Sequence, residues 1–183
     1  MDPLKFAAYI AYLTAWVVIA GVAAWSIVSR RHRETATEAR LHIPVIVGTL
    51  LQCGAAVVIT RSIPEDTLAV SRAQLGGILV LAPLGAAAFT WAMLAVKQDT
   101  RGLVTEGCYR WLRHPIYLAF LAMLGATGLL VAPPNLLAAA VIIYLIGTEI
   151  RIAAEEAELV ERFPEDYPLY CRQTRWRYLP PLR

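Results

Sequence analysis

The sequence is poor in charge and in the cysteines that hold small secreted domains together. Only 17% of its 183 residues are charged, against about 25% in an average soluble domain. Three cysteines, an odd number in a chain of this length, exclude a small secreted module stabilised by disulfides. Disordered chains are polar and rich in charge, so a hydrophobic fraction of 58% excludes that class as well.

Patterns that bind metals or nucleic acids are also missing. The cysteines (Cys53, Cys108 and Cys171) are far apart, and no spacing among them is typical of metal ligands. The net charge of +3 is modest, and no arginine-rich stripe alternates with aromatic residues. We therefore predict no metal site and no nucleic-acid partner.

Four segments without a charged residue hold most of the apolar side chains. They cover residues 6–29, 41–60, 73–96 and 116–148. The hydrocarbon core of a bilayer is about 30 Å thick, so a helix needs about 20 residues to span it. The first three segments fit one helix each. The fourth fits two, roughly 115–132 and 135–150, because Pro133-Pro134 interrupts it. We predict an all-α, polytopic integral membrane protein with five transmembrane helices.

The basic residues predict the orientation of these helices. Lys and Arg number 14 in the connections on one side and 3 on the other. The positive-inside rule places the side with 14 in the cytoplasm, so we expect the N-terminus outside and the C-terminus in the cytoplasm, at the cell membrane if the source is prokaryotic. Residues 6–29 are interpreted as a span rather than a signal peptide, because the apolar run is long and its basic cluster follows it.

The first segment with candidate functional residues is 103–120, just before the fourth predicted span. Gly107 permits a turn or a close backbone approach. His114-Pro115 marks a helix start, because proline is favoured at the first helical position. The free N–H groups of that first turn suit an anion such as a carboxylate. The alternative interpretation is that Arg113 and His114 only anchor the helix end among lipid headgroups.

The second segment, 149–170, begins at the end of the fifth predicted span. Arg151 and Glu155 are four residues apart and share one helical face, whereas Glu156 lies about 100° further round. Ionisable groups at a membrane boundary are costly unless they are paired or wetted, so they are candidates for function. The alternative is a solvated helix with ordinary i,i+4 ion pairs.

The two segments contain one ordered set of motifs: Leu103-Val104-Thr105, Gly107, Tyr109, Arg113-His114-Pro115-x-Tyr117, Arg151-x-x-x-Glu155-Glu156, Phe163, Tyr167 and Tyr170. In order and spacing this set resembles the isoprenylcysteine carboxyl methyltransferase (ICMT) family of integral membrane enzymes. The resemblance covers roughly residues 101–183. We therefore treat 1–183 as a single membrane domain. Residues 1–100 hold three transmembrane helices, and 101–183 hold a methyltransferase core with a helical hairpin and a cytoplasmic C-terminal cofactor-binding cap.

The resemblance implies methyl transfer that depends on S-adenosylmethionine, with S-adenosylhomocysteine as product. The acceptor would be lipidic or prenylated, with a carboxylate such as that of isoprenylcysteine, and would be methylated at the cytoplasmic face of the bilayer. Carried over by position, the catalytic residues are Arg151, which should face the acceptor, and Glu155. The cofactor-binding residues implied by the resemblance are Gly107, Tyr109, Arg113, His114, Pro115, Tyr117, Glu155 and Glu156.

Other functions remain open at this point. A phospholipid amine or a thiol would also fit a membrane-side pocket, and an amine would need a base such as His114 or Glu155. Sterol-type ene reductases, which use NADPH, share an Arg-His-Pro-x-Tyr segment, but they usually carry polar residues where 118–122 is apolar. A membrane scaffold without enzymatic activity would use the charged clusters as topology anchors. The oligomeric state is also open.

Overall fold

The computed structural model describes residues 3–30, 43–60, 70–98 and 102–178. Within these ranges the secondary structure is helical, apart from a single parallel bridge between Leu112 and Trp176. The elements are α1 (Pro3–Arg30), α2 (Ile43–Thr60), α3 (Arg72–Gln98), η1 (Gly107–Arg110, a 3-10 turn), α4 (Pro115–Val131), α5 (Pro134–Arg162) and α6 (Asp166–Gln173). The prediction of an all-α chain is confirmed.

Among the described residues, three helices are long and apolar enough to cross a membrane: Pro3–Val22 within α1, Arg72–Val96 within α3, and α5. The sequence predicted five. The apolar parts of the other two helices are shorter, Ile46–Val57 in α2 and Pro115–Val131 in α4. Helix α4 has 17 residues because proline bounds it at both ends. Many of the basic residues behind the predicted orientation, including Arg31, Arg33 and Arg40, lie outside the described residues.

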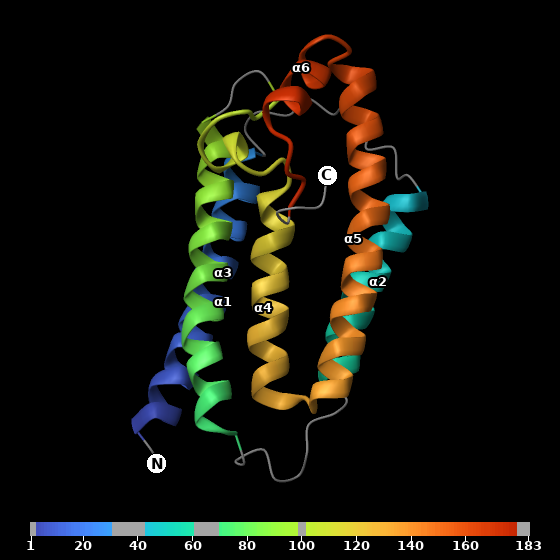
Figure 1. Ribbon diagram of the computed structural model, residues 1–183. Helices are drawn as coiled ribbons and strands as arrows, with labels where there is room; N and C mark the ends of the chain where they lie inside the picture. The colour runs from blue at the N-terminus through green and yellow to red at the C-terminus, as the bar shows by residue number, and fades with distance from the viewer. Residues whose placement is uncertain (1–2, 31–42, 61–69, 99–101, 179–183) are drawn as a thin grey trace.

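The helices pack in two groups that meet at the Pro133-Pro134 turn (Figure 1). Helices α1, α3 and α4 form one group, and α2 packs along α5 in the other. The predicted hairpin is present, with α4 ending at Val131 and α5 starting at Pro134. Helices α2 and α5 cross closely at Gly48 and Gly147, where a Cβ on Gly48 would lie 2.7 Å from the Gly147 carbonyl oxygen. This crossing brings Arg151 of α5 against α2.

Residues 102–114 and 163–178 close one end of the bundle, and we call them the cap. In Figure 1 the C-terminal segment after α6 descends beside the loop that leads into α4. The backbone N–H of Arg113 donates to the Trp176 carbonyl (2.9 Å), and that of His114 donates to the Arg177 carbonyl (2.7 Å). The Tyr170 hydroxyl donates to the Tyr109 carbonyl at 2.8 Å. These hydrogen bonds fix the start of α4 against the C-terminal segment.

Candidate active site

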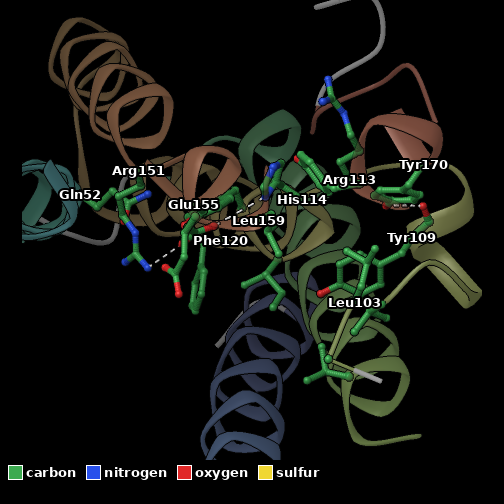
Figure 2. A pocket seen from close by; sticks show the side chains of 17 residues that line it. Gln52, Leu103, Tyr109, Arg113, His114, Phe120, Arg151, Glu155, Leu159 and Tyr170 are labelled. Carbon is green, nitrogen blue, oxygen red and sulfur yellow. Dashed lines mark hydrogen bonds and ion pairs between the residues drawn. The ribbon is translucent and has the colours of Figure 1, made fainter. Parts of the chain in front are cut away.

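A cavity of about 500 Å³ lies between α2, α4, α5 and the cap. This volume is within the range of small-molecule and cofactor sites. Figure 2 shows Gln52 and Arg151 toward one end and Leu103, Tyr109 and Tyr170 toward the other, with Glu155 and His114 between them. One end of the cavity therefore lies between helices α2 and α5, and the other lies under the cap.

His114 is placed by the residues on both sides of it in the sequence. Pro115 begins α4, so His114 takes the non-helical N-cap position. Its ring is 8% exposed, with Nε2 3.3 Å from Glu156 Oε1 and Nδ1 3.6 Å from Glu155 Oε2. The imidazole therefore lies between the carboxylates of two adjacent residues of α5.

Glu156 is the centre of a half-buried charge cluster. Arg113 Nη1 lies 2.9 Å from its Oε1, and Arg177 Nη2 lies 2.9 Å from its Oε2. Arg177 also contacts Glu149 at 2.7 Å. Burial acts to lower the pKa of Arg113, but the nearby Glu156 carboxylate and Cys171 thiol outweigh it, so the pKa is raised and the guanidinium stays charged. The cluster joins the loop before α4, helix α5 and the C-terminal segment.

Glu155 belongs to a different network, which faces the cavity. It accepts hydrogen bonds from Arg151 Nη2 (3.1 Å) and from the Tyr117 hydroxyl (2.5 Å). Arg151 Nη1 also donates to Thr49 Oγ1 of α2 at 3.1 Å, and the guanidinium lies 5.5 Å from the centre of the Tyr117 ring. Arg151 is thus held from α2, α4 and α5 while it lines the cavity.

The cap end of the cavity carries three tyrosines, Tyr109, Tyr167 and Tyr170. Tyr167 is 2% exposed, and the Cys171 thiol lies beside its hydroxyl. Burial, together with the Glu156 charge, raises the pKa of Tyr167, so the phenol stays protonated and able to donate. A thiol is only a weak acceptor, and a ligand in the adjoining cavity would offer this buried hydroxyl a stronger one.

The structure brings most of the predicted site residues together. Tyr109, Arg113, His114, Tyr117, Arg151 and Glu155 all line the cavity. Three others, Gly107, Pro115 and Glu156, do not line the cavity. Gly107 starts η1 with a φ of +64°, a conformation that favours glycine. Pro115 opens α4, and Glu156 holds Arg113 and Arg177.

Several lining residues were not predicted as site residues. They include Gln52, Phe120, Glu158, Tyr167 and Tyr170. Glu158 is three residues after Glu155 on the same helical face, so this spacing could have predicted that Glu158 also lines the cavity. Gln52 Nε2 donates to Thr148 Oγ1 at 2.9 Å. Such a bond between helices is the usual role of a polar side chain in a span, and nothing in the sequence marks its place at the cavity.

The comparison with protein-family models settles the family. The model of the isoprenylcysteine carboxyl methyltransferase (ICMT) family matches residues 67–161, just over half of the chain. The chain belongs to the isoprenylcysteine carboxyl methyltransferase family. No curated protein matches it. The ICMT family consists of membrane methyltransferases, so its chemistry is methyl transfer. The family match includes His114, Arg151 and Glu155, but ends before α6 and starts after α2.

Proposed function

We propose that this ICMT-family protein transfers the methyl group of S-adenosylmethionine to the carboxylate of a lipidic acceptor, such as isoprenylcysteine, at the cytoplasmic face of the membrane. One observation carries the proposal: a single cavity connects the polar cap with Arg151 between the membrane helices α2 and α5. A soluble cofactor and a membrane-embedded acceptor can meet in such a cavity.

The chemistry of the cap end fits the cofactor. S-adenosylmethionine supplies an electrophilic methyl group. Glu155 and Glu158 line the cavity and suit the positive ammonium and sulfonium groups, whereas Glu156 is already engaged by arginines. The charged Arg113 and the protonated Tyr167 hydroxyl, both of which line the cavity, suit a carboxylate. The tyrosines offer flat apolar faces to an adenine ring.

Arg151 is the candidate residue for orienting the acceptor carboxylate. A guanidinium binds a carboxylate through two parallel hydrogen bonds. A carboxylate is already a nucleophile, so the protein needs to position it and exclude water rather than deprotonate it. Glu155 shares the charge of Arg151 at 3.1 Å, and this contact keeps the arginine from neutralising the acceptor completely. Phe120 and Gln52 line the same end of the cavity.

In the proposed topology, all of α1 to α5 cross the bilayer, with α2 and α4 as short spans. The cap and the charged end of α5 then lie in the cytoplasm and the N-terminus lies outside. The chain is a single membrane domain, in which the first three helices support a core made of α4, α5 and the cap.

The first experiment is calorimetric titration of S-adenosylhomocysteine into the detergent-solubilised protein, with NADPH titrated in parallel. We expect S-adenosylhomocysteine to bind in the micromolar range and Glu155→Gln to weaken it at least tenfold, because one charge-assisted contact contributes about 1.5–3 kcal/mol. Glu161→Gln, an exposed position two turns further along α5, is the matched control and should bind normally. Binding of NADPH alone would indicate a reductase, and binding of neither would favour a scaffold.

The acceptor chemistry needs a second measurement. After incubation with radiolabelled S-adenosylmethionine and a prenylated cysteine, a carboxyl methyl ester releases volatile methanol in base, whereas N-methyl and S-methyl products do not. We expect base-labile label with the free carboxylate and none with the corresponding carboxamide. If the label were stable in base and found in a phospholipid or a thiol, the assignment of a carboxylate as acceptor would be overturned. The assignment of S-adenosylmethionine as the methyl donor would stand.

A further inference from the structure

Two identical Arg-Trp dipeptides, distant in the sequence, lie together on the outside of the cap. Arg110-Trp111 stands at the end of η1, with Arg110 as its last residue, and Arg175-Trp176 follows α6. The parallel bridge between Leu112 and Trp176, together with the hydrogen bond from Arg113 N–H to the Trp176 carbonyl, sets the two segments side by side. We call these four side chains the Arg-Trp surface.

The Arg-Trp surface is open and positively charged. Its four residues, with Gln173 and Thr174, line a hollow of about 450 Å³ that contains no acidic side chain. Trp111 is 67% exposed and Trp176 is 40% exposed, and both arginines are exposed. Neither arginine takes part in an ion pair among the described residues. The acidic residue Glu106 lines an adjoining hollow that Arg110 also borders.

This combination fits one ligand chemistry. Arginine binds phosphate through its planar, two-pronged guanidinium, and tryptophan is enriched where a protein meets the headgroup level of a bilayer. Two exposed tryptophans beside two unpaired arginines therefore match a phosphate headgroup joined to an apolar tail. We propose that the Arg-Trp surface binds the headgroup of an anionic phospholipid of the surrounding bilayer.

The place of the surface in the fold supports this occupant. In Figure 1 the cap segments lie at the end of the bundle where α4 begins and where α5 turns from apolar to charged. The same two segments carry Arg113, His114 and Arg177 inward to Glu156. A lipid on the Arg-Trp surface thus contacts the outer side of the segments whose inner side chains build the candidate site. The proposal does not depend on methyl transfer.

Native mass spectrometry of the full chain, titrated with phosphatidylglycerol or with phosphatidylcholine of the same acyl chains, tests the proposal. We expect phosphatidylglycerol to be retained more strongly than phosphatidylcholine. The double variant Arg110→Gln/Arg175→Gln should bind phosphatidylglycerol roughly thirtyfold more weakly, from about fivefold for each basic residue near an anionic lipid surface. Arg110→Lys/Arg175→Lys, which keeps the charge, should retain most of the preference.

Arg172→Gln is the matched control. Arg172 is exposed on α6 but does not line the hollow, so its loss should leave the affinity for phosphatidylglycerol unchanged. If Arg172→Gln weakened phosphatidylglycerol binding as much as Arg110→Gln or Arg175→Gln alone, the effect would be one of net charge. That result would overturn the proposal. Equal retention of the two lipids by the unsubstituted chain, or unchanged affinity in the double glutamine variant, would overturn it too.

Discussion

Glu155 and Glu156 are sequence neighbours with different surroundings. The side chain of Glu155 faces the cavity and contacts Arg151 and Tyr117, whereas Glu156 is enclosed by Arg113, His114 and Arg177. The turn of about 100° between successive residues of a helix separates them. Removing the negative charge at each position should therefore produce different defects.

Glu156→Gln should destabilise the fold by about 2 kcal/mol, because it leaves the half-buried Arg113 guanidinium without its carboxylate partner. Arg113 has no other ion pair in the described part of the chain. Glu155→Gln should unfold near the temperature of the unsubstituted protein and lose affinity for S-adenosylhomocysteine. Thermal denaturation in micelles, with ligand binding measured well below the transition, separates the two effects. The opposite pattern would place Glu156 in the cofactor site and Glu155 in the scaffold.

Arg151→Ala should abolish methyl transfer while leaving the binding of S-adenosylhomocysteine mostly intact. The side chain lies at the end of the cavity beside Gln52, away from the cap tyrosines (Figure 2). Arg151→Lys keeps the charge without the two-pronged geometry and should recover only part of the rate. Turnover with the prenylated carboxylate and calorimetry of the same preparations measure both properties. If Arg151→Ala lost methyl transfer and S-adenosylhomocysteine binding to the same extent, Arg151 would be a cofactor-binding residue instead.

At the scale of elements, the crossing of α2 and α5 positions Arg151. A Cβ on Gly48 would lie 2.7 Å from a backbone oxygen, and backbone cannot yield as a flexible side chain can. Gly48→Ala should thus force the helices apart and cost about 1–3 kcal/mol, as overpacking typically does. Gly54→Ala, six residues along α2 with nothing within 4 Å of the added Cβ, should be neutral. Melting temperatures of both variants in the same detergent check the difference. A loss of methyl transfer specific to Gly48→Ala is expected as well.

Elements differ in how far the sequence predicts them. The lengths of the uncharged segments and the positions of the prolines predicted helices at 73–96 and 115–132. The observed ends of α3 and α4 lie within two residues of these bounds. Helix α5 continues past the predicted end of its span at 150 to Arg162. The helical spacing of Arg151, Glu155 and Glu156 already indicated this continuation, and the stretch contains no glycine or proline. The pairing of Leu112 with Trp176 was not predictable, since it joins segments more than sixty residues apart through backbone groups that carry no sequence signal. The role of Arg177 in holding Glu156 depends on that pairing.

At the scale of the whole molecule, the number of spans decides where the site lies. In the part of the chain that the structure describes, three helices meet the length and apolarity of a span, and α2 and α4 contain shorter apolar stretches. Cavity residues come from both short helices, Gln52 from α2 and Tyr117 from α4. If either helix lay outside the bilayer, an acceptor could not reach Arg151 from the lipid.

Single cysteines in a background without Cys53, Cys108 and Cys171 test the crossings of α1, α2 and α5 in intact cells. A membrane-impermeant maleimide should label Lys5→Cys, Glu65→Cys and Asn135→Cys, and should label Arg33→Cys and Glu161→Cys only after lysis. The reason is that the connections on the predicted cytoplasmic side hold 14 Lys and Arg residues and those on the other side hold 3. This difference favours one orientation for the five crossings. The pair at 33 and 65 reports on α2, and the pair at 135 and 161 reports on α5. Labelling of both members of a pair from outside would show that the helix between them does not span. For α2, that result would also remove the membrane-side end of the proposed cavity from the bilayer.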